Sequence, residues 1–280
     1  MTKKVPWASI HSSEAHICGN AANATNELKT ISGLLPLAFM PMLNRLANYL
    51  GYTPKTNPHQ DFSRETLSEI AAVEPFTMTS PERIVSLIGA VEYIERVSIP
   101  GDIVECGVWR GGSMMAVAHA LLRLQKTRHL YLFDTFEGMP PPTNADINLR
   151  GDKASELLKK SDHSAWIWAE AQIDEVRRNM EQTGYPQDKV TYVKGEVEDT
   201  IPAQAPPQIA LLRLDTDWYE STKHELIHLY PRLSSGGVLL IDDYGHWQGA
   251  RRAVDEYIEE NKLRLLLCRI DYTGRIAVKV

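Results

Sequence analysis

The stretch Leu211–Trp247, "LLRLDTDWYESTKHELIHLYPRLSSGGVLLIDDYGHW", carries the pattern that decides the fold. One apolar run ends at Asp215, a segment with helical composition follows, and a second apolar run ends on Asp242 and Asp243. Two apolar strands joined through a helix are typical of a parallel β-α-β unit. Carboxylates about 4 Å apart repel by roughly 4 kcal/mol at an effective dielectric near 20. If the strands are neighbours, this charge must be held in place.

The same alternation of strands and helices continues on both sides of this unit. A helix is predicted to begin at Pro81, with Thr79 or Ser80 as its N-cap, and glycines are predicted to close the helix that starts near Tyr219. The predicted strands lie at 102–105, 129–134, 189–194, 208–215 and 238–243, with an antiparallel hairpin in 263–280. We therefore predict an α/β protein with a seven-stranded, mostly parallel sheet and a C-terminal antiparallel hairpin. This is the Rossmann-like fold of class I methyltransferases.

The length of 280 residues favours one large domain with an extension. We predict a helical extension at 1–73, for oligomerisation or as a lid, and a catalytic domain at 74–280. Its long polar segment, 137–164, is predicted to be an insertion without regular structure that serves as an active-site lid. The apolar segment Leu28–Leu50 is interrupted by charged residues and prolines, so it predicts a kinked packing helix and a homo-oligomer rather than a membrane span.

Composition narrows the function classes. A net charge of −6 without a cluster of Lys and Arg gives no indication of a nucleic-acid partner. The three cysteines are widely spaced and odd in number, which favours a reducing compartment over a disulfide framework. The N-terminus lacks the apolar core of a secretory signal, and we predict a cytoplasmic protein.

The turn "ECGVWRGGS" at 105–113 predicts a cofactor site. Its glycines allow a ligand to approach the backbone at a helix N-terminus, and Asp134 lies where an acidic residue can bind ribose hydroxyls. A nicotinamide cofactor fits less well, because the turn is not G-x-G-x-x-G and Glu105 would repel a pyrophosphate. An ammonium group would instead be attracted to Glu105, and we infer S-adenosylmethionine. Simple tight packing of the turn is the alternative.

The strand-end aspartates predict a metal site. The oxygens of Asp215, Asp242 and Asp243 suit Mg²⁺ with open positions for substrate oxygens. A nearby base could then take the proton of a substrate hydroxyl, and the candidates are Asp215 and His246. His246 could equally form a local hydrogen bond at the start of a helix, and Asp217 is expected to be a helix cap or a supporting carboxylate.

Six motifs in order resemble the macrocin O-methyltransferase family over about residues 74–262. They are "FTMTSPERI", "PGDIVECGVWRGGS", "LFDTFEGMP", "KGEVEDT", "LLRLDTDWYEST" and "YPRLSSGGVLLIDDYG". The resemblance implies S-adenosylmethionine- and Mg²⁺-dependent methylation of a sugar hydroxyl in a glycosylated natural product, as in antibiotic biosynthesis. It also implies that the metal ligands are Asp215, Asp242 and Asp243, with Asp215 as general base. The implied cofactor residues are Met78, Thr79, Glu105, Gly107 and Ser113 at the methionine end, Asp134 at the ribose and Glu196 at the adenine.

Three alternatives remain open at this point. A catechol-type O-methyltransferase would use the same metal chemistry on an aromatic diol. An NAD-dependent oxidoreductase is disfavoured by Glu105 and by the glycine spacing. A non-enzymatic scaffold that assembles through Leu28–Leu50 would leave the acidic strand ends unexplained.

Overall fold

The computed structural model describes residues 59–163 and 165–280. Asp61–Val280 form one compact unit that contains the whole sheet. The predictions for Leu28–Leu50 lie outside the described residues. Within the described ranges, no helix combines the length and the apolar character that a membrane span requires.

Seven strands form one sheet in the order β3-β2-β1-β4-β5-β7-β6. The first five strands run parallel, and β7 pairs antiparallel with both β5 and β6. The strands are β1 Asp102–Cys106, β2 Leu130–Asp134, β3 Val190–Lys194, β4 Ile209–Leu214, β5 Leu233–Ile241, β6 Cys268–Arg269 and β7 Arg275–Val278. The predicted fold class and the C-terminal hairpin are confirmed.

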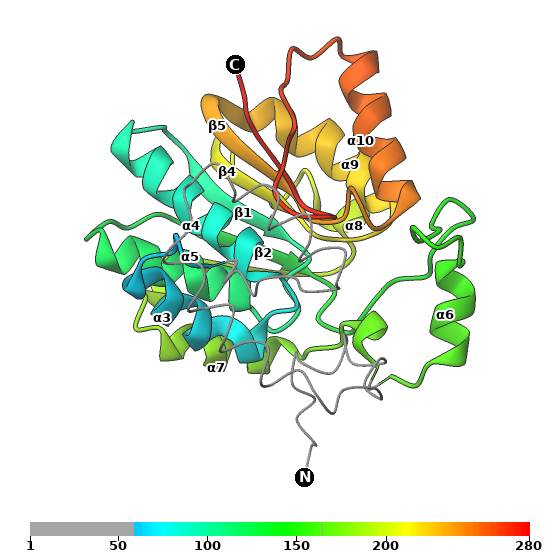
Figure 1. Cartoon of the computed structure of the whole chain (residues 1–280), viewed down its shortest axis with the longest axis horizontal. Helices are drawn as coiled ribbons and strands as arrows, with labels where there is room; N and C mark the ends of the chain where they lie inside the picture. Colours follow the sequence, from blue (N-terminus) through cyan, green and yellow to red (C-terminus); the bar gives the residue numbers. More distant parts are fainter. Residues whose placement is uncertain (1–58, 164) are drawn as a thin grey trace, which may run out of the picture. The chain divides into compact units, whose positions relative to one another are not determined.

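Helices cover both faces of this sheet (Figure 1). One face carries α3 Arg64–Val73, α4 Pro81–Arg96, α5 Gly112–Arg123 and α7 Ile173–Gln182, and the other carries α8 Val197–Thr200, α9 Tyr219–Leu229 and α10 Gln248–Glu260. Short 3-10 turns lie at Glu74–Phe76, Trp166–Trp168, Gln187–Lys189 and Tyr230–Arg232. Successive strand residues point to opposite faces, so Leu211 packs in the first core and Leu212 in the second.

Helix α4 begins as its sequence predicts. Ser80 is the N-cap, its hydroxyl oxygen accepts a hydrogen bond from the Arg83 backbone at 3.3 Å, and Pro81 occupies the first turn. Apolar side chains at three- and four-residue steps are buried against the sheet; they are Ile84, Leu87, Ile88, Val91 and Ile94. This capping fixes the segment before α4 beside the strand ends.

The prediction that glycines close the helix before β5 is wrong. Helix α9 ends at Leu229, Pro231 lies in the following 3-10 turn, and β5 already begins at Leu233. Gly236 therefore lies inside the strand, where its φ of +78° accompanies the irregular register of the β4–β5 pair. A proline ends the helix, and the glycine permits the irregular strand.

The prediction that the insertion has no regular structure is wrong for part of its described residues, 137–163. The insertion contains α6, Ala154–Lys160, and Asn148 forms a β-bridge with Trp247. The indole Nε1 of Trp218 donates to the carbonyl of Pro140 at 3.0 Å. These contacts dock the insertion onto the starts of α9 and α10, and its role as a lid stays a prediction.

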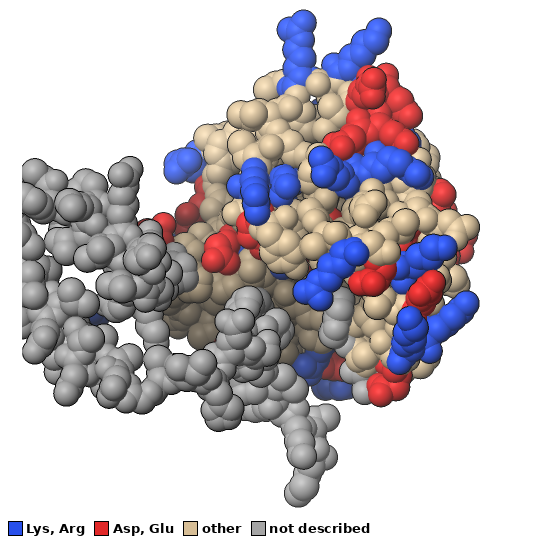
Figure 2. All heavy atoms as spheres, turned by 45° about the vertical axis from the view of Figure 1, so that its right-hand side comes forward, with Lys and Arg blue, Asp and Glu red and all other residues tan. Residues whose placement is uncertain are grey.

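Charged side chains of both signs are interspersed on the face shown in Figure 2. Helix α10 contributes two such pairs, Arg251 with Asp255 at 3.6 Å and Arg252 with Glu256 at 3.5 Å. Exposed pairs of this kind contribute little to stability.

Candidate active site

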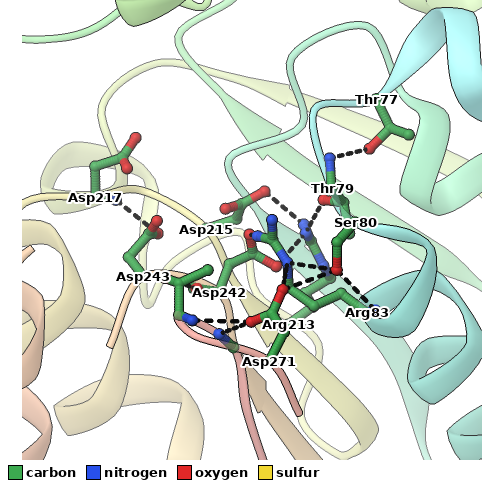
Figure 3. A network of polar contacts seen from close by, with 12 residues as sticks. Thr77, Thr79, Ser80, Arg83, Arg213, Asp215, Asp217, Asp242, Asp243 and Asp271 are labelled. Atoms are coloured by element: carbon green, nitrogen blue, oxygen red, sulfur yellow. Dashed lines mark hydrogen bonds and ion pairs between the residues drawn. The ribbon is translucent and has the colours of Figure 1, made fainter. Parts of the chain in front are cut away.

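The predicted metal residues meet at the carboxyl edge of the sheet (Figure 3). Asp215 directly follows β4, and Asp242 and Asp243 directly follow β5, which is the parallel neighbour of β4. One carboxylate oxygen from each aspartate lies within 4.8 Å of the others. Asp242 and Asp243 are buried, whereas the side chain of Asp215 is 27% exposed. The cluster therefore opens outward at Asp215.

A buried arginine lies beneath this cluster. Arg213, in β4, has a side chain that is only 2% exposed. Its Nη1 donates to Glu105 Oε1 and to Asp215 Oδ2, both at 2.7 Å. Its Nη2 donates to Thr79 Oγ1 at 2.8 Å and to Asp242 Oδ1 at 2.6 Å. One guanidinium thus joins β1, β4, the end of β5 and the segment before α4.

A second arginine reaches the same carboxylates from α4. Arg83 forms an ion pair with Asp242 Oδ2 and another with Asp271 at 3.0 Å. Asp271 also accepts a hydrogen bond from the Ser80 hydroxyl at 2.8 Å. The start of α4 is therefore tied to the strand ends and to the hairpin that follows β6.

Carboxyl groups outnumber arginines at this edge. Arg83 and Arg213 face six carboxyl groups, those of Glu105, Asp215, Asp217, Asp242, Asp243 and Asp271. Burial, reinforced by repulsion from Asp217 and Asp215, raises the pKa of Asp243. Three clustered carboxyl groups are hard oxygen donors that fit a Mg²⁺ ion, and such an ion would favour their ionised form. The residues present are therefore compatible with the metal that the sequence predicts.

Asp217 supports the cluster but does not cap α9. Its backbone N–H donates to Asp243 Oδ2 at 3.3 Å, and burial followed by repulsion from Asp215 raises its pKa. The first N–H of α9, that of Tyr219, donates instead to Oδ1 of the buried Asp146 at 2.8 Å. The interpretation of Asp217 as a helix cap is wrong because the insertion supplies the cap.

His246 lies beside the metal cluster. Its backbone N–H donates to the carbonyl of Asp243 at 3.0 Å, and its ring packs edge-on against Trp247. Nδ1 is buried and has no hydrogen-bond partner among the described residues. Burial, with smaller contributions from Arg150 and Arg83, lowers the pKa of His246. The lowered pKa favours the neutral imidazole, and the role of His246 as a base stays a prediction.

The glycine turn lies directly against the loop that carries Asp215. Gly107 has a φ of +81°, and a Cβ built on it would lie 2.0 Å from the carbonyl oxygen of Asp215. The Asp215 N–H also donates to the carbonyl of Cys106 at 2.8 Å. Only glycine fits this position without displacing the loop that carries Asp215, which we call the metal loop because of its predicted ligand.

Asp134 binds the same turn from β2. Its Oδ2 accepts the N–H groups of Val108 at 2.6 Å and Trp109 at 3.0 Å, and its Oδ1 accepts that of Phe136 at 2.7 Å. Burial raises the pKa of Asp134, and these hydrogen bonds oppose the rise. The carboxylate therefore shapes the turn, and its contact with the cofactor ribose stays a prediction.

Glu105 is the most unusual group of the predicted cofactor pocket. It is completely buried in β1, and its Oε2 receives no hydrogen bond from any residue in the described ranges. Burial raises its pKa to about 8; Arg213 lowers the pKa, whereas Asp215 and Asp134 add to the rise. A buried carboxylate oxygen that lacks a donor fits the ammonium group of S-adenosylmethionine.

The other predicted cofactor residues divide into two groups. Thr79 and Ser113 are buried, and Thr79 contacts Arg213. Glu196 is exposed just before α8, after Gly195, whose N–H donates to the carbonyl of Asp134. Met78 is 39% exposed. The structure brings Thr79 to Glu105 and the aspartate cluster through Arg213, whereas in the described part of the chain Met78 forms no hydrogen bond or ion pair with them.

Several residues of the site did not emerge from the sequence. Arg213 carried a usable signal, since it is a lone charge inside the apolar run of β4. Glu225, completely buried in α9, accepts a hydrogen bond from Thr216 beside Asp215 at 3.0 Å. Trp218 is 3% exposed and packs edge-on against Trp247, so it belongs to an apolar cluster beside the site.

Several known proteins are similar to this chain in sequence and in fold. The macrocin-O-methyltransferase (TylF) family profile matches residues 36–278. The chain is 34% identical over 200 residues to the 8-demethyl-8-(2,3-dimethoxy-alpha-L-rhamnosyl)-tetracenomycin-C 4'-O-methyltransferase of Streptomyces olivaceus, covering 71% of this chain and 73% of that relative. It is 33% identical over 206 residues to the mycinamicin III 3''-O-methyltransferase of Micromonospora griseorubida, covering 71% and 76%.

The solved structure of the O-methyltransferase NovP superposes with a TM-score of 0.63 at 31% identity, covering 73% of this chain and 82% of that chain. The calicheamicin methyltransferase CalS11, at 18% identity and a TM-score of 0.56, shares the fold. The family profile spans most of the chain, including every strand and the whole aspartate cluster. The chain belongs to the macrocin O-methyltransferase family.

Proposed function

We propose that this protein is an S-adenosylmethionine- and Mg²⁺-dependent O-methyltransferase that acts on a sugar hydroxyl of a glycosylated small molecule. The observation that carries the proposal is the clustering of Asp215, Asp242 and Asp243 next to the buried Glu105. The first group suits a metal that binds substrate oxygens, and Glu105 suits the ammonium group of the cofactor. The three aspartates form the metal half of the site and Glu105 belongs to its cofactor half, and the two halves adjoin at one edge of the sheet.

The acceptor class comes from the relatives. One relative is named for methylation at the 4' position of a rhamnosyl tetracenomycin, and another for methylation at the 3'' position of mycinamicin III. A third relative from Streptomyces niveus, 32% identical over 200 residues, is named a demethyldecarbamoylnovobiocin O-methyltransferase. These names favour a glycoside over a catechol as the acceptor.

The residues divide the chemistry between them. Bound S-adenosylmethionine supplies the methyl group, and bound Mg²⁺ polarises the acceptor oxygen. Asp215, Asp242 and Asp243 would hold the metal, and Glu105 would hold the cofactor's ammonium group. Asp215, the most exposed of the three aspartates, accepts the hydroxyl proton.

Substituting each candidate base in turn shows which of the two accepts the hydroxyl proton. Asp215→Asn is expected to lower kcat by about 10³-fold, because it removes both a metal ligand and the proton acceptor. His246→Asn is expected to lower kcat by less than about tenfold and to leave the shape of the pH–kcat profile unchanged. Rates should be measured between pH 6 and pH 9. A loss of about 10³-fold in His246→Asn would assign the base to His246 instead.

The acceptor is tested with a substrate panel. Purified protein, Mg²⁺ and S-adenosylmethionine labelled on the methyl group should be incubated with rhamnosyl glycosides of polyketides and, in parallel, with catechols. We expect label on a sugar oxygen, located by mass spectrometry and NMR. Methylation of catechols alone would contradict the proposal.

A further inference from the structure

The position of Arg213 in the sheet determines what it can do. Its guanidinium is buried, and it contacts Glu105 as well as Asp215 and Asp242. Figure 3 shows Arg213 among the aspartates and Thr79. Glu105 and Arg213 are paired across the parallel strands β1 and β4, so both side chains point to the same face. Arg213 is the donor to Glu105 Oε1, and that leaves Oε2 as the open position.

The other three acceptors fix the guanidinium. Thr79, Asp215 and Asp242 each accept a hydrogen bond from it at 2.6 to 2.8 Å, and they come from three different segments of the chain. A planar guanidinium held at both terminal nitrogens has little freedom to rotate. Asp215 and Asp242 therefore help to fix the position of the guanidinium, and the guanidinium in turn fixes the orientation of the Glu105 carboxyl group.

We propose that Arg213 is a positioning residue for the cofactor, which acts by fixing the carboxyl group of Glu105 without touching the cofactor itself. A completely buried carboxylate is costly to ionise unless a cation lies beside it. Arg213 supplies that cation on one oxygen and directs the other oxygen toward the ammonium group. The inference rests on the proposed function, because it takes S-adenosylmethionine as the ligand of Glu105.

Arg83 provides a matched comparison. It is also an arginine that pairs with Asp242, but its second carboxylate is Asp271, and the described contacts include none between Arg83 and Glu105. Loss of Arg83 removes the same charge from the same edge of the sheet. It should spare the orientation of Glu105.

The test measures binding by calorimetry in EDTA, so that no metal contributes. The two ligands are S-adenosylhomocysteine and 5'-methylthioadenosine, which has the same nucleoside but no amino-acid end. Arg213→Gln is expected to weaken S-adenosylhomocysteine binding by about tenfold or more and to change 5'-methylthioadenosine binding by less than about twofold. Arg83→Gln should change the binding of either ligand by less than about twofold.

A double-mutant cycle with Glu105→Gln completes the design. In that background, adding Arg213→Gln should weaken S-adenosylhomocysteine binding no further, because the two residues act on one group. Circular dichroism checks folding, and Arg213→Lys, which keeps the charge but not the fork, serves if the glutamine variant does not fold. The lysine variant is expected to weaken binding by about fivefold.

The possible outcomes distinguish a failure of the proposed role of Arg213 from a failure of the proposed methyltransferase function. Equal weakening of both ligands by Arg213→Gln, or an effect that persists in Glu105→Gln, would show a general structural role and overturn the inference. Unchanged S-adenosylhomocysteine binding in Arg213→Gln or Arg213→Lys would also overturn it while leaving the proposed function intact. A wild-type protein that binds neither ligand would refute both.

Discussion

Replacing Asp243 with asparagine is expected to lower kcat/KM for methyl transfer by about 10³-fold, about 4 kcal/mol of transition-state stabilisation. Asp243 is the cleanest of the three aspartates to change. Within the described chain no arginine forms an ion pair with it, whereas Asp242 pairs with both Arg83 and Arg213. Asp243→Asn therefore removes a carboxylate from the metal cluster without leaving a buried guanidinium unpaired.

The measurement is the initial rate against Mg²⁺ concentration, with EDTA as the metal-free reference. The asparagine variant should need far more Mg²⁺ for half-maximal rate and should keep its melting temperature, since burial already raises the pKa of Asp243. Asp255→Asn, on the exposed face of α10, is the matched control and should retain wild-type rates. Wild-type activity in EDTA, or an unaltered Mg²⁺ requirement in Asp243→Asn, would show that these aspartates hold no catalytic metal.

Gly107→Ala is expected to destabilise the protein by about 4 kcal/mol and to lower the melting temperature by about 10 °C. The added Cβ would lie 2.0 Å from the Asp215 carbonyl oxygen, at a backbone φ of +81°. A left-handed residue alone costs about 1–2 kcal/mol. The remainder comes from displacing either the glycine turn or the metal loop, so activity should be lost even in the fraction that stays folded.

A second glycine separates these two causes. Gly151 has a φ of +91°, but a Cβ built on it meets no atom within 4 Å. Gly151→Ala should therefore cost only the conformational part, about 1–2 kcal/mol, and lower the melting temperature by about 3 °C. Thermal unfolding of both variants measures the difference. Equal shifts would mean that the turn and the metal loop are not closely packed.

The sheet was predictable because its signal is local. Apolar runs such as 211–214 mark buried parallel strands, and the carboxyl ends of parallel strands share one edge, so Asp215 and Asp242 could be placed together. The helix boundary before β5 was not predictable in this way. A glycine such as Gly236 is typical of a helix end. Only the pairing of its segment with the neighbouring strand shows that it lies inside β5.

The charges that organise the site depend on register and on long-range contacts. That Arg213 faces Glu105 follows from the β1–β4 register, which the sequence does not specify. The pairing of Arg83 with Asp242, and the capping of α9 by Asp146, join segments far apart in the chain. The sequence pattern locates the acidic residues, whereas the tertiary structure shows which of them are already paired.

The central claim is that one edge of the sheet holds a metal at Asp215, Asp242 and Asp243 and the cofactor's ammonium group at Glu105. A crystal grown with Mn²⁺ and S-adenosylhomocysteine tests it most directly, because anomalous scattering locates the ion. We expect one Mn²⁺ bound by oxygens of the three aspartates, and an ammonium nitrogen within hydrogen-bonding distance of Glu105 Oε2. Binding of Mn²⁺ away from these aspartates, or of the amino-acid end away from Glu105, would contradict the account.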